Sequence, residues 1–239
     1  MGRKPIFDAL HDNVELEKVW IDSSIKGAIE KDIRQMTRAR KIPLQYVPKE
    51  KLTSLTATKV HQGVAGLLSI VNYMSIEDVM PHIYEQGKTP ALLVLDGIED
   101  VRNIGALARS AVWFDMDAIV VSMKKTARIN SFAYKASAGA IKDIPICREM
   151  SLIKAIQYLK DSGVKIVIAD ISPDDNKTLI DYKEPIALVM GSEGSGVVRE
   201  VRALADGVVT IPGSGKVESL NVSVAGALLM SELYKARIH

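Results

Sequence analysis

The sequence predicts an α/β protein in which a small α/β domain precedes a larger domain built on a parallel β-sheet. Its 239 residues are 47% hydrophobic and 25% charged, which is ordinary for compact folded protein and disfavours disorder, collagen and coiled coil. Beyond residue 75, short continuous apolar runs alternate with helical segments, as in parallel sheets that are covered on both faces. We therefore expect a sheet-based domain with a separate unit in front of it.

The front unit is expected to span residues 1–70 and to mix short helices with short strands. The pattern predicts helices at Ile6–His11, Ile25–Arg38 and Lys49–Leu52, and strands at Leu16–Ile21 and Leu44–Val47. In the stretch HQGVAGLLSI, residues 61–70, Gly63 and Gly66 indicate a close-packed turn and a strand. Residues 71–75 are expected to link this unit to the second domain, residues 76–239.

The second domain is expected to alternate strands with helices. Its apolar runs predict strands at Ala91–Asp96, Ala118–Ser122, Ile144–Cys147, Val164–Asp170, Ile186–Gly191 and Val208–Ile211. Helices are predicted between most of them, at Asn103–Phe114, Ser131–Gly139, Ser151–Asp161 and Val197–Ala205. The last predicted helix is Asn221–Arg237, with an apolar stripe of Val222, Ala225, Leu229 and Leu233.

The net charge is close to zero but unevenly distributed. With 31 Lys and Arg against 29 Asp and Glu it is +2, far from the strongly basic signature of a dedicated nucleic-acid binder. Residues 1–73 hold 12 basic and 8 acidic residues, net +4, whereas residues 74–239 hold 19 and 21, net −2. Helical spacing puts cations of the front unit on one face, for which a solvated surface is the plain interpretation: Lys31, Arg34, Arg38 and Lys41.

The sequence favours a cytoplasmic protein. The longest uncharged run, residues 60–76, has 17 residues and includes His61 and Asn72, so it falls short of the ~20 apolar residues that a membrane span needs. The N-terminal region meets acidic residues before any apolar segment develops, unlike a secretory signal. The single cysteine, Cys147, cannot form an intramolecular disulfide, which points to a reducing compartment.

Several familiar motifs are missing from the sequence. The glycines of GSEGSG, residues 191–196, stand at relative positions one, four and six, whereas the dinucleotide fingerprint needs one, three and six. Gly215 and Lys216 lack the other residues of a phosphate-binding loop, so ATP hydrolysis is not supported. There is no G-x-S-x-G elbow. No metal is expected, because the histidines are scattered without metal-ligand spacing: His11, His61, His82 and His239.

Three polar clusters follow predicted strands, which is where ligands bind in α/β proteins. The first, after ALLVLD, contains N-x-G-x-x-x-R from Asn103 to Arg109. The second is G-S-E-G-x-G from Gly191, and the third is S-L-N-V-S-V-A from Ser219. Any one of these motifs is weak, but the three in this order form a specific signature.

Taken together, the region from Leu92 to the C-terminus resembles the SpoU (TrmH-like) RNA ribose 2′-O-methyltransferases of the SPOUT superfamily. The front unit is similar to that family's ribosomal-protein-L30e-like substrate-binding domain, through GRKPIFDAL near its start and HQGVAG ending at Gly66. The whole arrangement looks like the members that modify a guanosine in 23S ribosomal RNA.

The resemblance implies a deep trefoil knot in the parallel-sheet domain, with S-adenosylmethionine (SAM) as the cofactor. It also implies RNA as the partner, ribosomal RNA favoured over transfer RNA, and a homodimer. Ala225, Gly226 and Ala227 would permit close helix approach in such a dimer. Glycines without a Cβ would permit the tight backbone crossings of a knot, and the candidates are Gly191, Gly194, Gly196, Gly213, Gly215 and Gly226.

The site residues are also implied by the resemblance. The catalytic positions match Asn103, Arg109, Glu193, Ser219 and Asn221. The cofactor-binding positions match Leu188, Met190, Gly191, Ile211 and Leu220, with Leu188 and Met190 as walls of the pocket. Helix caps and turn formers are alternative interpretations of Asn103 and Ser219.

Arg109 needs a role that its chemistry allows. The family mechanism makes this arginine the general base, but a guanidinium has a pKa above ~12 and is a very poor base. We favour a role in binding the adjacent phosphate and stabilising the developing alkoxide. The sequence departs from the family pattern at Val101-Arg102, where Asp-Pro is usual, and at Gly213, where methionine is usual. Neither change removes a catalytic group.

The alternatives are a 2′-O-methyltransferase of transfer RNA and a non-catalytic RNA-binding or ribosome-assembly protein that retains the fold. The presence of Asn103, Arg109, Glu193 and Asn221 favours an enzyme. A third alternative, a small-molecule methyltransferase, would not explain the cationic face of the front unit or the HQGVAG segment.

Overall fold

The computed structural model of the protein describes residues 1–12, 14, 16–123, 126, 128–171 and 180–238. Contacts within the chain divide it into two compact units, Met1–Ser69 and Ile70–His239. All three polar clusters of the sequence lie in the second unit.

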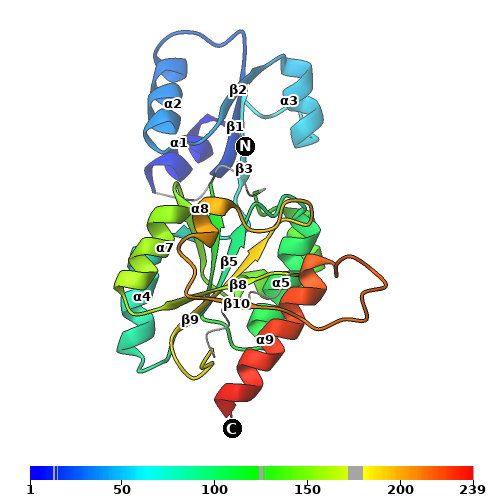
Figure 1. The fold of residues 1–239 in the computed structure, drawn as a ribbon. Helices are drawn as coiled ribbons and strands as arrows, with labels where there is room; N and C mark the ends of the chain where they lie inside the picture. The colour runs from blue at the N-terminus through cyan, green and yellow to red at the C-terminus, as the bar shows by residue number, and fades with distance from the viewer. Residues whose placement is uncertain (13, 15, 124–125, 127, 172–179, 239) are drawn as a thin grey trace. The chain divides into compact units, whose positions relative to one another are not determined.

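In the described part of the first unit, one sheet has the strand order β2-β1-β3 (Figure 1). Strand β1 (Leu16–Asp22) runs parallel to β2 (Leu44–Val47) and antiparallel to β3 (Val64–Leu68). Apolar side chains join one face of this sheet to helices α1 and α2, and the other face to helix α3. These helices are α1 (Arg3–His11), α2 (Ala28–Ala39) and α3 (Lys49–Thr56).

The cationic face predicted for the front unit is present on α2, with one correction. Lys31, Arg34 and Arg38 are exposed, and Arg34 forms an ion pair with Glu30 one turn earlier, at 3.5 Å. Lys41 lies beyond the helix, in a turn with φ +53°, because α2 ends at Ala39. The face is therefore shorter than its spacing predicted.

The second unit contains the parallel sheet that the sequence predicted. Among the described residues, seven strands run parallel in the order β10-β8-β9-β5-β6-β7-β4. The strands are β4 (Tyr73–Met74), β5 (Ala91–Asp96), β6 (Ala118–Ser122), β7 (Ile146–Glu149), β8 (Lys165–Ala169), β9 (Ile186–Gly191) and β10 (Gly207–Val209). The helical segments are α4 (Ile76–Glu85), α5 (Val101–Trp113), α6 (Ser131–Ala136), the 3-10 turn η1 (Ala140–Lys142), α7 (Leu152–Asp161), α8 (Arg199–Arg202) and α9 (Val222–Ile238).

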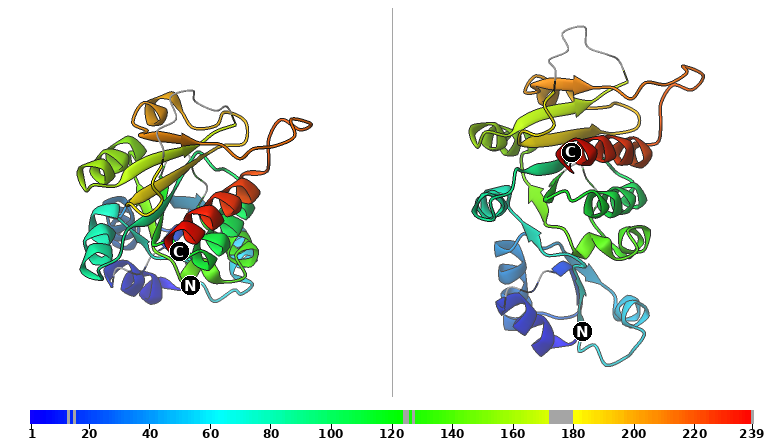
Figure 2. Two further views of the ribbon diagram at one scale, coloured as in Figure 1. Left: turned by 60° about the horizontal axis from the view of Figure 1, so that its bottom comes forward. Right: turned by 90° about the horizontal axis from the view of Figure 1, so that it is seen from below.

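Helices cover both faces of this sheet (Figures 1 and 2). Along β5, Leu93 and Leu95 point into the core shared with α5, α6 and α9, whereas Leu92 and Val94 point into the core shared with α4, α7 and α8. This alternation explains why the central strands are apolar throughout, since neither face meets water. The three-layer α/β arrangement predicted from the sequence is confirmed.

Two elements of the second unit were absent from the sequence prediction. The expected connector at residues 71–75 contains β4, in which Tyr73 pairs with Ile146 of β7. Helix α4 follows, capped by Ser75, whose hydroxyl accepts from the backbone N–H of Asp78. Pro81 inside α4 hid the helix, although its buried residues keep helical spacing: Ile76, Val79, Met80 and Ile83.

The helix predicted at Val197–Ala205 is much shorter in the structure. Only Arg199–Arg202 is helical, and its start is set by Val198, which is extended, with ψ 151°. The helix predicted at Ser131–Gly139 ends earlier, at Ala136, and the separate turn η1 follows at Ala140–Lys142. In contrast, the predicted apolar stripe of α9 is confirmed, with Val222, Leu229 and Leu233 buried and Ala225 packed beside them.

Candidate active site

The candidate site lies at the carboxyl ends of β5, the central strand of the sheet, and of its neighbour β9. The chain leaves β5 toward the α5 face of the sheet and leaves β9 toward the α8 face, since α5 and α8 contribute to opposite cores. Neighbouring parallel strands whose connections diverge in this way open a crevice between them, which is the usual ligand site of an open α/β sheet. The first two polar clusters begin at this point.

A hydrogen-bonded cluster of three side chains joins all three motifs. One carboxylate oxygen of Glu193 accepts from the amide nitrogens of Asn103, at 3.0 Å, and Asn221, at 2.7 Å. The amide nitrogen of Asn221 also donates to the side-chain oxygen of Asn103, at 3.2 Å. The cluster is open to solvent, because Glu193 and Asn221 are exposed and Asn103 is half-buried. Residues far apart in the sequence thus form one polar site.

Each asparagine is held by the start of a helix. Asn103 is in the first turn of α5, which Asp100 caps by accepting from the backbone N–H of Arg102, at 2.8 Å. The Arg102 guanidinium also binds Asp100, and these hydrogen bonds lower the pKa of that carboxyl. Asn221 precedes α9, and its side-chain oxygen accepts from the N–H of Ser223, at 2.9 Å, and from its hydroxyl, at 2.6 Å. The cap therefore turns the amide nitrogen of Asn221 toward Glu193.

Glu193 is carried by a tight hairpin. Ser192 and Gly196 exchange two backbone hydrogen bonds, at 2.9 and 3.2 Å, and the Ser192 hydroxyl lies 2.7 Å from that of Ser195. A Cβ on Gly191 would lie 2.0 Å from the backbone carbon of Gly196, so only glycine permits this close return. The hairpin requires the glycine at which the second motif begins.

The glycines predicted to permit tight crossings divide into two groups. A Cβ would meet close neighbours at Gly191 and at Gly226, where the side chain of Leu107 lies 2.4 Å away. The other four have open space around them, so crowding does not require glycine there: Gly194, Gly196, Gly213 and Gly215. Gly196 and Gly215 instead have positive φ, +63° and +72°, a backbone conformation that favours glycine. Gly226 also lets α9 approach α5 inside the chain, and Ala225 packs against the same core.

Arg109 and Ser219 do not join the cluster. Arg109 is exposed on α5, six residues after Asn103, which turns it about 120° around the helix from that residue. Ser219 is exposed in the segment before α9, as are its neighbours from residue 212 onward. The catalytic roles predicted for both residues stay predictions.

The residues predicted to bind the cofactor occupy different surroundings. Leu188 and Met190 are each only 3% exposed and pack in the α5–α9 core, so they are walls buried behind the crevice. Ile211 is half-buried against the same core, and Leu220 is 44% exposed. The exposed backbone at Gly213 and the exposed apolar side chain of Leu220 are of the polar and apolar kinds that contact an adenosine, so these two residues are compatible with SAM.

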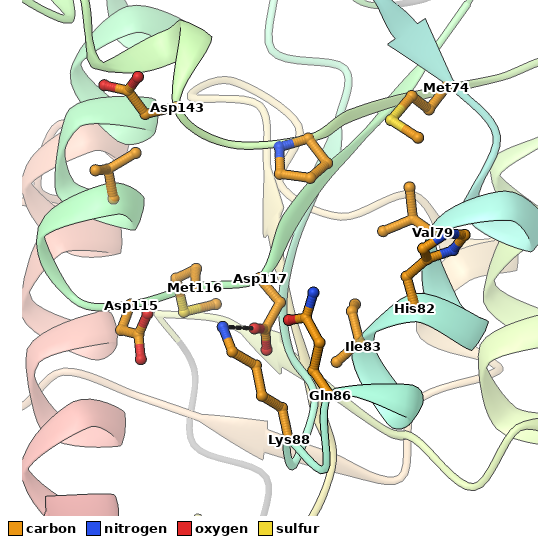
Figure 3. Close-up of a pocket in the computed structure, with 12 residues that line it drawn as sticks. Met74, Val79, His82, Ile83, Gln86, Lys88, Asp115, Met116, Asp117 and Asp143 are labelled. Carbon is orange, nitrogen blue, oxygen red and sulfur yellow. Dashed lines mark hydrogen bonds and ion pairs between the residues drawn. The ribbon is translucent and has the colours of Figure 1, made fainter.

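Two cavities of the second unit lie at the amino ends of the strands, opposite the motif cluster, and Figure 3 shows one of them. One of about 440 Å³ is lined by residues before β5, β6 and β7, among them His82, Lys88 and Asp117. Lys88 donates to Asp117 at 3.0 Å, and this carboxylate raises the pKa of Lys88. Asp117 also accepts from the backbone N–H of Ala91, at the start of β5. These groups stabilise the amino ends of the strands and are remote from the motif cluster.

Other chemistries find little support. Burial raises the pKa of the Cys147 thiol to about 12, so this cysteine is not a reactive nucleophile. Within the part of the chain that the structure describes, no three His, Cys, Asp or Glu side chains gather as a metal site, and His239 lies outside that part. None of the described helices is long and apolar enough to cross a membrane.

Sequence reasoning missed two residues that organise the site. Asp96 ends β5 and is buried, and Ser223 orients Asn221. A carboxylate that closes an otherwise apolar strand was the available signal for Asp96. Ser223 gave no such signal, because a serine two residues after an asparagine is common at helix starts.

Comparison with known proteins identifies the class as RNA-modifying α/β enzymes. A model described as the SpoU rRNA Methylase family matches residues 90–231, and one described as RNA 2'-O ribose methyltransferase substrate binding matches residues 1–74. The chain belongs to the SpoU rRNA methylase family, which is a family of SAM-dependent RNA methyltransferases.

Relatives match over nearly the whole chain. A Bacillus subtilis protein, named as a TrmH family tRNA/rRNA methyltransferase, is 33% identical over 238 residues, which is 99% of this chain and 95% of that protein. A Mycobacterium ulcerans protein, named as a tRNA/rRNA methyltransferase, is 34% identical. The match covers 99% of this chain and 76% of the length of that protein.

Solved structures share the fold. An AdoMet-bound rRNA methyltransferase from Sinorhizobium meliloti has a TM-score of 0.63 at 23% identity. The match covers 98% of this chain and 85% of the Sinorhizobium chain. The TrmH/SpoU tRNA modifying enzyme of A. aeolicus has a TM-score of 0.57 at 26% identity. The match covers 63% of this chain and 77% of the A. aeolicus chain.

Proposed function

We propose that this protein transfers the methyl group of SAM to the ribose 2′-hydroxyl of a nucleotide, a guanosine in 23S ribosomal RNA. The observation that carries the proposal is the meeting of three motifs at Glu193, which accepts from both Asn103 and Asn221. The family model of the front unit, which is described by ribose 2′-O methylation, supports the 2′-hydroxyl as the acceptor. The sequence resemblance supports guanosine and the 23S molecule.

The proposed mechanism relies on positioning. Bound SAM supplies a methyl group that its sulfonium charge already activates, so the chain has to align the hydroxyl and stabilise the oxygen as its proton leaves. Glu193 fixes the amides of Asn103 and Asn221, which hold the target nucleotide beside the crevice. Ile211, Leu220 and the backbone at Gly191 would hold the adenosine of bound SAM, while Leu188 and Met190 would support the crevice from behind. Ser219 fixes the segment before α9.

Arg109 has the role of a phosphate ligand in this proposal. Its planar guanidinium can bind two phosphate oxygens at once and can stabilise charge on the reacting oxygen. The hydroxyl proton then leaves through the phosphate or solvent, since a guanidinium does not accept it. The exposure of Arg109 supports a contact with RNA rather than a structural role.

The front unit, residues 1–70, is the proposed L30e-like RNA-binding domain. Its net charge of +4 and the exposed Lys31, Arg34 and Arg38 of α2 support contacts with phosphates. Residues 76–239 form the proposed knotted catalytic domain. The trefoil path of the C-terminal segment and the cytoplasmic location stay predictions.

A homodimer is part of the proposal. Large apolar side chains are exposed on the outer sides of neighbouring helices: Trp113 (79%) on α5, Phe132 (64%) on α6, and Val224 (48%) and Leu228 (44%) on α9. Contiguous exposed apolar patches mark interfaces in soluble proteins, and these side chains on neighbouring helices support this side as the docking surface. Arg109 precedes Trp113 by one helical turn, so a second chain docked here would bring Arg109 toward that chain.

The test is a methylation assay with SAM labelled in its methyl group and total RNA from bacteria that lack the gene. We expect label in 23S ribosomal RNA at a guanosine whose ribose resists alkaline cleavage on its 3′ side. Asn221→Ala should abolish transfer. Asn130→Ala is the matched control, because Asn130 caps α6 in the same way, accepting from the N–H of Phe132 at 2.9 Å.

Each other outcome selects an alternative. Label in transfer RNA would assign the protein to that substrate, and label on a base would contradict ribose methylation. Failure of the protein to bind SAM at millimolar concentration would favour a non-catalytic RNA-binding or assembly protein.

A further inference from the structure

Asp96 places a buried carboxylate beside the candidate site. It ends β5 after five aliphatic residues and is only 3% exposed. Burying a carboxylate is costly unless hydrogen bonds compensate it. Its Oδ2 accepts from the backbone N–H of Val198, at 2.8 Å, across more than a hundred residues of sequence. An aliphatic residue would close the strand without this cost, so the carboxylate calls for an explanation beyond packing.

Asp96 holds both ends of the hairpin that carries Glu193. The backbone of Asp96 is in register with Gly191, where the hairpin leaves β9. Its side chain binds Val198, where the hairpin ends and α8 begins. Between these two points, the backbone bridge between Ser192 and Gly196 makes the hairpin a stiff unit. A displaced end would therefore move Glu193 at its tip.

We propose that Asp96 is a positioning residue that acts through Glu193. By tying Gly191 and Val198 to one point of β5, it sets the Glu193 carboxylate where it accepts from Asn103 and Asn221. The proposal rests on the methyltransferase function proposed above, and it adds a residue that the sequence motifs did not assign to the site.

The first test compares Asp96→Ala with Asp96→Asn. Asp96→Ala removes the acceptor, and we expect kcat for RNA methylation to fall by about 10²-fold while KM for RNA stays unchanged, because a misplaced group costs rate. Asp96→Asn keeps an oxygen that accepts from Val198 and should restore most of the rate. Asp117→Ala is the matched control, since Asp117 binds the N–H of Ala91 at the other end of β5. It should lower thermal stability without lowering kcat.

The second test asks whether Asp96 acts through Glu193. In a double-mutant cycle, Asp96→Ala should reduce kcat little further once Glu193→Ala is present, because the two changes remove the same arrangement. If the reductions in kcat from the two single variants multiplied in the double variant, the proposal would be overturned. A normal kcat in folded Asp96→Ala would overturn it as well.

A variant of the donor keeps the proposal testable if Asp96→Ala does not fold. Val198→Pro replaces the N–H by a ring carbon, so the Asp96 carboxylate loses its donor and must move aside, while the φ of −64° at Val198 already suits proline. It should reproduce the loss of kcat, and a normal kcat would contradict the proposal. Absence of methylation by the unmodified protein would instead refute the proposed function, so the two failures are distinguishable.

Discussion

Asn221 serves a helix and the candidate site with one side chain. Its oxygen binds Ser223 at the start of α9, and its nitrogen binds Glu193 and Asn103. An aspartate would cap α9 equally well. It would, however, present a second carboxylate to Glu193 where an amide donor is needed. The requirement for asparagine here therefore comes from the site rather than from the helix.

Arg109→Lys tests the phosphate-binding role of the arginine. Lysine keeps the positive charge but lacks the planar fork, so we expect methyl transfer to fall by about tenfold or more while the affinity for SAM is unchanged. Single-turnover rates together with SAM titrations would measure both quantities. A rate near that of the unmodified protein would show that the fork is irrelevant.

At the scale of elements, the site depends on how closely helices approach α5. Gly226 of α9 lies against Leu107 of α5, and this packing sets the starts of both helices beside each other. Asn103 and Asn221 occupy those starts. A residue with a larger side chain at Gly226 would push α9 outward and separate the two amides.

Gly105→Ala probes the packing of α5 on α6. Alanine raises helix propensity by about 1 kcal/mol, but its Cβ would lie 2.3 Å from the carbonyl oxygen of Ala133, and backbone yields little. We expect the overlap to dominate and the free energy of unfolding to fall by about 1–3 kcal/mol. Thermal or denaturant unfolding would measure the change. Gly213→Ala, which meets open space, is the control, and a rise in stability for Gly105→Ala would contradict the argument.

At the scale of the whole molecule, the position of Arg109 indicates how the site is completed. It lies on the exposed side of α5 near Trp113, away from the cluster at Asn221. In the proposed homodimer, the arginine of one chain would act with the cluster of the other. A symmetric dimer would then contain two sites, each built from both chains.

Mixing two inactive variants tests this shared site. Arg109→Ala and Asn221→Ala should each be inactive, but after exchange half of the dimers would carry one intact site. We expect the mixture to recover about a quarter of the activity of the unmodified protein. Methyl transfer before and after exchange of chains would measure it. No recovery, with chain exchange verified by crosslinking, would place Arg109 and its cluster in the same chain.

Sequence patterns predicted the second unit well where one local rule decides the outcome. The bounds of β5, β6 and β9 match the prediction, because continuous aliphatic runs between polar turns have few other structures available. The predictions differ where distant contacts decide: β4 exists because β7 pairs with it, and the start of α8 lies at extended Val198, which Asp96 of β5 binds.

The sequence by itself determined the class of the protein: the parallel sheet, the three motifs and the family they resemble. Only the tertiary structure decided that Asn103, Glu193 and Asn221 share hydrogen bonds, that Arg109 faces outward and that Asp96 holds the hairpin. The physical reason is the distance along the chain between the residues that interact. Burial and local spacing leave a periodic record in the chain, whereas a hydrogen bond between residues a hundred positions apart leaves none until the sheet brings them together.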